Sequence, residues 1–387
     1  MSLHPRTPGS AQDTGPALPD SVLPDSVLPH RALPDRRRPG LSPPAAALGR
    51  VFGDAALALT WRVLQARAHG PYTIATPPVA VERLYYTSDD GWQCPLFLLP
   101  ARPGTSGEPV LLAHGLGGTH RDFALEPARC LASALSHAGF SVYLFEHRAD
   151  RSALPPPEAP PFTIDDLATR DLDAALTAVV VHSGFRRVLA IGHGLGAQIL
   201  YLRLALQGQD ELAGLMSIGG AVRFDVHASA ARAAGSLAAL LPANWILPGR
   251  RLQQAVSPFV ASGDDIASPG TDGPVARARL RHASGDLHGG VLRQMARWAQ
   301  IGHLTDATGR IDVTQALRPL PSLILEPDAD PACPPGAAEP AAPPLDAHFR
   351  RLTGGWGHLD PLLGTRAGTD VHADLLQFCE AWRRRCW

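Results

Sequence analysis

Short apolar runs alternate with helix-like segments along most of the chain, and this pattern limits the fold more than any other feature. The runs are apolar at nearly every position instead of at every second one. Such runs are typical of parallel strands that helices cover on both faces, so the sequence predicts an α/β fold with a mostly parallel central sheet. The expected strands are Pro109–Gly115, Ser141–His147, Arg187–Gly192, Gly214–Gly220, Pro321–Pro327 and His348–Gly354, after a hairpin of Val79–Ser88 and Gln93–Pro100, and the expected helices lie near Ala45–Ala68, Pro127–Ala138, Ile164–His182, Leu195–Ala205 and Thr369–Arg384.

The alternation stops after Gly220 and resumes only at Pro321. A plain loop of that length is uncommon in a compact domain, so an inserted helical cap is expected over residues 221–320. Within it, Gly285–Leu304 carries apolar residues at helical spacing, at Val291, Leu292, Met295, Trp298 and Ile301, which predicts a helix with one face buried. The main domain is then split into residues 45–220 and 321–387.

Residues 1–44 differ from the rest of the chain in composition. They are rich in Pro, Arg, Asp and Ser, and Leu-Pro recurs every five residues from Leu18 to Leu33. Such a segment buries too little apolar surface to offset its ordering entropy. A disordered, Pro-rich tail is expected.

The amino-acid composition excludes several kinds of binding partner and chemistry. The 387 residues carry 35 basic and 36 acidic side chains, so no global field favours nucleic acid. No lysine is present, which excludes Schiff-base chemistry. No apolar run reaches the ~18 residues of a membrane span, and five scattered cysteines form no CxxC pair. These features predict a cytoplasmic protein with no nucleic-acid partner, no metal and no cofactor; they leave the oligomeric state open.

The turn Gly192-His193-Gly194-Leu195-Gly196 stands between an apolar strand and a helix. This context is typical of a nucleophile elbow, a sharp turn that exposes the side chain of its middle residue. Here that residue is Gly194, which has no side chain. An alternative is a dinucleotide fingerprint in which Gly192, Gly194 and Ala197 satisfy GxGxxA and Glu211 is the ribose-binding acid.

Two further residues follow in the chain order that a nucleophile, acid and base require. Asp330 comes just after an apolar strand, with Asp328 as a fallback, and His358 lies in the Gly-rich loop "GGWGHLDPLLG". A histidine backed by a carboxylate is held in one tautomer and becomes a better general base. The sequence predicts an Asp330–His358 dyad.

The segment "AHGLGGTHRDF", Ala113–Phe123, follows an expected buried strand. A Gly-rich turn there can aim backbone N–H groups at an oxyanion, with Leu116 as one donor and Leu195, next to the elbow residue, as the other. The candidates for the pocket wall are His114, His120 and His193. Two substitute nucleophiles are weighed: Ser217, which is expected to be buried, and Cys333, which is close to Asp330 in sequence.

From about Val79 to Trp387 these motifs resemble the α/β-hydrolase family, and "AHGLGG" and "GHLDPLLG" are most similar to bacterial esterase- or lipase-like members. The resemblance implies Asp330 and His358 as acid and base, with Leu116 and Leu195 as oxyanion donors. Gly194 departs from the family's serine, cysteine or aspartate.

The missing side chain separates three hypotheses. Serine enzymes without their nucleophile keep only about 10³–10⁴-fold acceleration, so the first hypothesis is a hydrolase homologue that is impaired in catalysis but still binds a hydrophobic or ester-like ligand. In the second, the His358–Asp330 dyad acts directly as a general base, in hydrolase, lyase or cofactor-free oxygenase chemistry. The third is a non-catalytic interaction scaffold.

Overall fold

A computed structural model describes residues 79–127, 129–224 and 240–386. The expected tail over residues 1–44 and the helix expected near Ala45–Ala68 lie outside this range.

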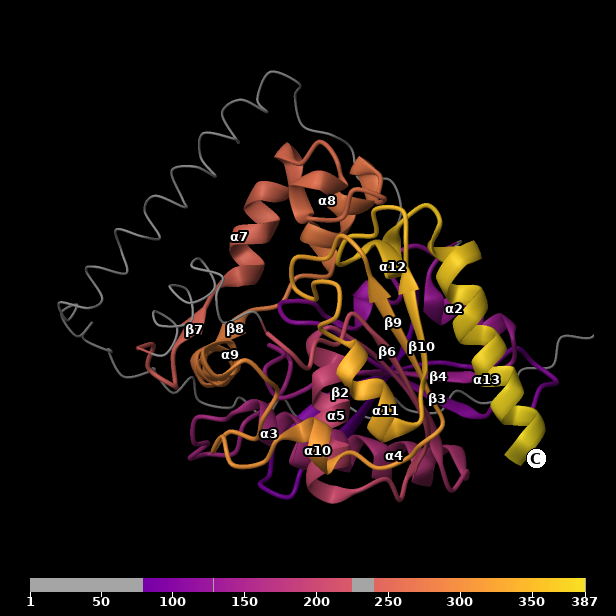
Figure 1. Cartoon of the computed structure of the whole chain (residues 1–387), viewed down its shortest axis with the longest axis horizontal. Coiled ribbons are helices and arrows are strands. Elements are labelled where there is room, and N and C mark those ends of the chain that lie inside the picture. The colour runs from indigo at the N-terminus through magenta and orange to yellow at the C-terminus, as the bar shows by residue number, and fades with distance from the viewer. Residues whose placement is uncertain (1–78, 128, 225–239, 387) are drawn as a thin grey trace, which may run out of the picture.

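The described chain is built on one eight-stranded sheet with the strand order β1-β2-β4-β3-β5-β6-β9-β10 (Figure 1). The first two strands form the expected antiparallel hairpin, and β2 pairs antiparallel with β4. Every later pair in the sheet is parallel, so the predicted mostly parallel sheet is confirmed. The strands are β1 (Glu82–Thr87), β2 (Gln93–Leu99), β3 (Pro109–Ala113), β4 (Ser141–Phe145), β5 (Val188–His193), β6 (Leu212–Ile218), β9 (Ser322–Pro327) and β10 (His348–Leu352).

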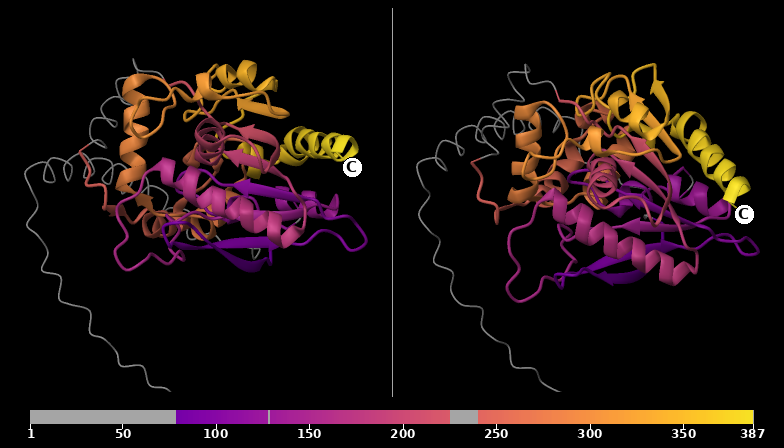
Figure 2. Two further views of the ribbon diagram at one scale, coloured as in Figure 1. Left: turned by 90° about the horizontal axis from the view of Figure 1, so that it is seen from below. Right: turned by 60° about the horizontal axis from the view of Figure 1, so that its bottom comes forward.

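Helices cover both faces of the sheet (Figure 2). Successive residues of β3 point to opposite faces: Leu111 joins one apolar cluster with Leu172, and Val110 joins the other with Leu131. This arrangement explains why the central strands, such as β3, are apolar at nearly every position. The helical elements here are η2 (His120–Asp122), α2 (Leu131–His137), α3 (Ile164–Asp166), η3 (Leu167–Asp171), α4 (Leu172–Ser183), α5 (Leu195–Gln207), η6 (Glu339–Ala341), α11 (Ala342–Leu345), α12 (Asp360–Leu363), η7 (Gly368–His372) and α13 (Ala373–Cys386).

A separate group of elements lies between β6 and β9 in sequence. In Figure 1, α7 and α8 sit beyond the carboxyl ends of the strands, where β9 and β10 point. The division at residues 221–320 into a cap stays a prediction. The elements are β7 (Ile246–Leu247), α7 (Gly249–Val256), η4 (Ser257–Phe259), η5 (Gly263–Ile266), α8 (Gly273–His282), β8 (Leu287–His288), α9 (Gly289–Ile301) and α10 (Val313–Ala316).

Helix α9 is the helix expected near Gly285–Leu304. Val291 and Trp298 are buried as predicted, but Ile301 is 40% exposed. Ile301 is the last residue of the helix, where the neighbouring elements no longer cover the apolar face.

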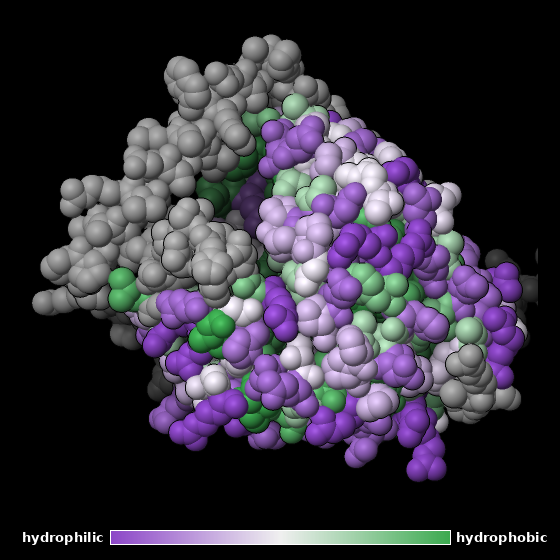
Figure 3. Space-filling model, viewed as in Figure 1, coloured by the Kyte–Doolittle hydropathy of each residue, from purple (hydrophilic) through white to green (hydrophobic). Residues whose placement is uncertain are grey.

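No helix within the described ranges is both long and apolar enough to cross a membrane. On the part of the face in Figure 3 that is not grey, hydrophobic residues are scattered among hydrophilic ones.

Candidate active site

The turn between β5 and α5 keeps the backbone of a nucleophile elbow. Gly194 caps α5 with φ +52° and ψ −115°, a conformation that residues with a side chain rarely adopt. Its N–H donates to the carbonyl of Ile218 at 2.9 Å, and its own carbonyl accepts from Ala197 and Gln198. The bend is therefore hydrogen-bonded on both sides, although nothing projects from it.

A flanking glycine lets α5 cross close to the sheet. A Cβ on Gly196 would lie 2.0 Å from the carbonyl oxygen of Ala113, at the end of β3. This contact is a packing requirement, so the glycine pattern needs no dinucleotide to explain it. Glu211, the ribose-binding candidate of that alternative, forms an ion pair with Arg203 at 2.8 Å.

The predicted acid and base lie together at the carboxyl end of the sheet. Nδ1 of His358 donates to Oδ2 of Asp330 at 2.7 Å, because a carboxylate can only accept. The other oxygen of Asp330 accepts the N–H of Ala332 at 2.7 Å. Burial would raise the pKa of Asp330, but the hydrogen bond and charge of His358 outweigh it and leave the pKa below its ordinary value. The aspartate is thus ionised, and Nε2 of His358 forms no hydrogen bond within the described part of the chain.

Asp328, the fallback acid, forms its hydrogen bonds with the backbone of the loop, whereas Asp330 is bonded to His358. Its carboxylate accepts the backbone N–H groups of Gly354, Gly355 and Trp356 at 2.7–3.2 Å. It therefore shapes the start of the loop that carries His358.

The base faces the elbow. A Cβ built on Gly194 would lie 3.2 Å from Nε2 and 3.1 Å from Cε1 of His358. The free nitrogen of the dyad therefore points at the place where a nucleophile would stand.

His193 supports the loop of the base from the elbow itself. Its Nε2 donates to the carbonyl of His358 at 2.9 Å, and the two rings lie 4.5 Å apart. Burial and the nearby charge of His358 lower the pKa of His193 to about 3, so this ring is neutral. Its position agrees with a role in orienting the turn.

The loop after β3 brings the two expected oxyanion donors to one cavity. Leu116 and Leu195 both line it, and neither backbone N–H donates a hydrogen bond within the described part of the chain. The carbonyl of Gly115 accepts from the N–H of Gly118 at 3.1 Å and from Nδ1 of His114 at 2.9 Å. Because N–H and C=O of one peptide unit point in opposite directions, these bonds fix the direction of the Leu116 N–H.

Glu146, at the end of β4, was missed by the sequence reading. Its buried carboxylate accepts from Nε2 of His114 at 2.9 Å and from Nδ1 of His120 at 2.6 Å. Burial lowers the pKa of His114, but Glu146 opposes this and raises it to about 9. His114 is therefore a buried imidazolium in an ion pair, whereas His120 bridges Glu146 and a separate cavity. The only available signal was the position of Glu146 directly after a buried strand.

A second missed pair ties the inserted segment to the same loop. Arg279 on α8 forms an ion pair with Asp122 at 3.1 Å, and its Nη2 reaches the carbonyl of Gly117 at 3.4 Å. Asp122 is buried, so this ion pair is shielded from solvent.

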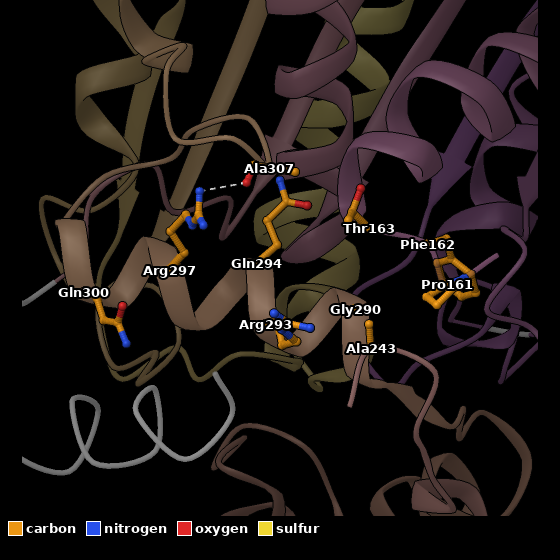
Figure 4. A pocket seen from close by; sticks show the side chains of 10 residues that line it. All are labelled: Pro161, Phe162, Thr163, Ala243, Gly290, Arg293, Gln294, Arg297, Gln300 and Ala307. Atoms are coloured by element: carbon orange, nitrogen blue, oxygen red, sulfur yellow. Dashed lines mark hydrogen bonds between the residues drawn. The ribbon is translucent and has the colours of Figure 1, made fainter. Parts of the chain in front are cut away.

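His358 opens into a cavity of about 280 Å³ that Leu116 also lines; its other polar lining residues are Asp122, His193, Gln253 and Arg279. A different cavity of about 330 Å³ lies along α9 and contains none of the expected site residues (Figure 4). In it Arg297 donates to the carbonyl of Ala307 at 2.9 Å. The volume of a cavity therefore does not identify the candidate active site.

Neither substitute nucleophile is accessible. Ser217 is fully buried, as expected, and so is Cys333. Burial and the charge of Asp330 raise the pKa of the Cys333 thiol, which disfavours the reactive thiolate. Among the described residues, no group of three or more His, Cys, Asp or Glu side chains is arranged to hold a metal ion.

Known proteins share this architecture. A family model described as alpha/beta hydrolase fold matches residues 108–246. Among solved structures, E-2-(acetamidomethylene)succinate hydrolase has a TM-score of 0.54 at 16% identity, covering 78% of this chain and 100% of that one. A hydrolase from Pseudomonas aeruginosa PA01 has a TM-score of 0.51 at 17% identity, with 77% and 98% covered. The chain has the α/β-hydrolase fold.

Esterases and lipases are among the similar proteins. A putative aryl esterase from Burkholderia cenocepacia has a TM-score of 0.50 at 17% identity, covering 79% of this chain and 100% of that one. Lipase member K of Homo sapiens is 28% identical over 129 residues, or 30% of this chain. That match spans 32% of the lipase, about a third of its length.

Proposed function

We propose that this protein binds an ester- or acyl-type carbonyl compound in the cavity at His358 and is impaired in serine-type hydrolysis. The observation that carries the proposal is the contact across the elbow: Nε2 of His358 faces Gly194 at 3.2 Å from the Cβ position, with no side chain between them. An acyl-enzyme needs a nucleophilic atom there. The covalent two-step route is therefore closed, while the base, its acid and the backbone donors remain.

The binding part of the proposal rests on the lining of the cavity. Its wall is mixed: Leu116, Ile266, Leu280 and Leu359 supply apolar surface, and the polar groups are Asp122, His193, Gln253, Arg279 and His358. A cavity that combines apolar walls with convergent polar groups can hold and orient a small molecule. A carbonyl oxygen placed between Leu116 and Leu195 would accept two backbone N–H groups.

A second candidate function is favoured by the geometry of the dyad. Asp330 accepts the N–H of Nδ1, so the lone pair of the neutral His358 ring lies on Nε2, and a water molecule at Gly194 could donate its proton there as its oxygen bonds to the ligand carbonyl. His358 then returns the proton to the leaving alkoxide, and the products are an acid and an alcohol. The same base could instead take a proton from the ligand, as in lyase or cofactor-free oxygenase chemistry.

The test compares the wild-type protein with Gly194→Ser and His358→Ala on short and medium p-nitrophenyl esters. We expect little wild-type turnover and a gain of esterase activity in Gly194→Ser, which is lost again in Gly194→Ser/His358→Ala. Labelling of Gly194→Ser, but not of wild type, by a fluorogenic phosphonate would report the restored nucleophile independently of turnover.

Two outcomes decide against the first proposal. Wild-type turnover that His358→Ala abolishes would favour the dyad as a direct general base. A folded Gly194→Ser that neither hydrolyses any ester nor reacts with the phosphonate would favour the interaction scaffold.

A further inference from the structure

Arginine side chains from distant parts of the chain converge on a cavity of about 420 Å³, which the loop after β3 lines with Thr119, His120 and Arg121. Arg121 lies in η2 after β3, Arg250 lies in the first turn of α7 and Arg281 lies in the last turn of α8. Against five arginines, the lining contains one carboxylate, Asp150. The five are Arg83, Arg121, Arg151, Arg250 and Arg281.

None of these five guanidinium groups forms an ion pair within the described part of the chain. Arg83 lies over the ring of Phe97, and Arg121 reaches only the carbonyl of His282 at 3.4 Å. Nε of Arg250 is buried and has no hydrogen-bond partner among the described residues. A buried guanidinium N–H without an acceptor is costly, so the cavity as it stands lacks anionic acceptors.

The one carboxylate in the lining does little to neutralise the cluster. Asp150 is engaged by the hydroxyl and the N–H of Ser152. Burial, together with the charge of Glu146, raises its pKa, which weakens it as a counter-charge. On the opposite wall, burial and then the charges of Arg121 and Arg281 lower the pKa of His282. The potential in the cavity is therefore positive.

The cavity adjoins the candidate active site through one loop. Gly115 and Leu116 line the cavity of His358, Leu116–Gly118 line a small cavity next to it, and Thr119–Arg121 line the arginine cavity. Asp150 lines both the small cavity and the arginine cavity. Residues 115–121 therefore connect the cavity of His358 to the arginine cavity along one loop.

We propose that the arginine cavity binds the phosphate group of the ligand, so that the compound recognised at the active site is an acyl ester or thioester with a phosphorylated head group. The inference rests on the proposed function for the position of the acyl carbonyl. Guanidinium groups suit phosphate because their N–H donors form paired, charge-assisted hydrogen bonds with its oxygens.

The binding test uses isothermal titration calorimetry of the full-length protein with inorganic pyrophosphate, coenzyme A and dihexanoyl phosphatidic acid. Arg250→Ser and Arg281→Ser each should weaken binding about tenfold, since each removes charge-assisted hydrogen bonds. The double variant should weaken it further, and binding to wild type should fall as salt is added. Arg186→Ser removes an exposed arginine at the amino end of β5, far along that strand from the elbow, and should leave binding unchanged.

The three probes separate the source of the phosphate. Tighter binding of coenzyme A than of phosphatidic acid supports a soluble thioester, and the reverse order supports a lipid head group. Thermal unfolding of Arg250→Ser and Arg281→Ser confirms that each variant is folded before its affinity is compared. The proposal is overturned if no probe binds to folded wild type, or if Arg186→Ser weakens binding as much as Arg250→Ser does.

Failure here and failure of the proposed function give different results. If Gly194→Ser gains activity on neutral p-nitrophenyl esters while no phosphate probe binds, only the phosphate inference fails. If the phosphate probes bind through Arg250 and Arg281 but Gly194→Ser gains no activity, the acyl site is wrong and the cavity stands alone as a phosphate site.

Discussion

Two histidine–carboxylate pairs lie at the carboxyl end of the sheet, and they are built for different purposes. In the pair of His358 and Asp330, one ring nitrogen is bonded to the carboxylate at 2.7 Å and the other faces a cavity. In the pair of His114 and Glu146, both ring nitrogens are bonded, to Glu146 at 2.9 Å and to the carbonyl of Gly115 at 2.9 Å. The first histidine is free to exchange a proton; the second is locked as a cation and holds a loop.

This difference shows why proximity of a histidine and an acid does not identify a catalytic base. What matters is whether a lone pair remains and where it points. Nε2 of His358 points at Gly194, whereas His114 has no nitrogen left for chemistry. The His114–Glu146 pair orients the loop that carries the Leu116 N–H, and the His358–Asp330 pair holds a partly exposed histidine whose Nε2 faces the cavity.

The largest effect is expected when the structural pair loses its acid. Glu146→Gln leaves His114 buried without a counter-charge and should reduce the free energy of unfolding by about 3–5 kcal/mol. Asp330→Asn is the matched change in the other pair; it should cost less stability and abolish the activity of Gly194→Ser. Denaturant unfolding measures the free energy of unfolding of both variants. An equal decrease in the two would contradict the proposed difference between the pairs.

The structural pair should also show itself in the pH dependence of stability. The pKa of His114 is about 9 in the folded protein against 6.5 for an ordinary histidine. The folded state therefore holds an extra proton between these values. The contribution of the pair is complete below pH 6.5 and is lost as the pH rises toward 9. Denaturant unfolding across this range should show the decline, and Glu146→Gln should flatten it.

A smaller effect is expected at the elbow. Gly194→Ala places a Cβ at φ +52° and 3.1–3.2 Å from the ring of His358, which should cost about 1–3 kcal/mol of stability. Unlike Gly194→Ser, it should gain no esterase activity, because it adds no nucleophile. An alanine variant as stable as wild type would mean that the elbow relaxes easily.

The smallest effect concerns the support of the base. His193→Phe removes the hydrogen bond to the carbonyl of His358 and should cost about 1 kcal/mol. When it is placed in the Gly194→Ser background, kcat should fall more than KM changes, because His358 is less well positioned. An unchanged kcat would show that the hydrogen bonds of Asp328 are enough to position the loop of His358 without His193.

Much of this organisation was predictable because its signals are local. The apolar runs identified every parallel strand except β10, whose sequence is mostly polar, and glycine on both sides of Gly194 identified the turn. Chain order alone proposed Asp330 and His358, because the carboxyl ends of parallel strands meet at one edge of the sheet. Ile301 was predicted to be buried and is 40% exposed, since periodicity does not say where the covering elements end.

The other groups of the site carry no local signal. Arg279 and Asp122 are separated by 157 positions, and Glu146 lies 32 positions from His114. Arg383, near the end of α13, lies 3.8 Å from the ring centroid of Phe140 and pairs with Glu108 at 2.9 Å. Such pairs depend on which surfaces of the fold meet, and a charged residue looks the same in sequence whether it is solvated or buried.

By itself, the sequence determined the α/β architecture, the glycine at the elbow and the absence of lysine, because periodicity and composition are properties of the chain. Only the tertiary structure decided which acid serves which histidine, which nitrogen stays free and where the arginines gather. These depend on distances of a few ångströms between segments far apart in the chain, and hydrogen bonds and ion pairs form or fail within that range.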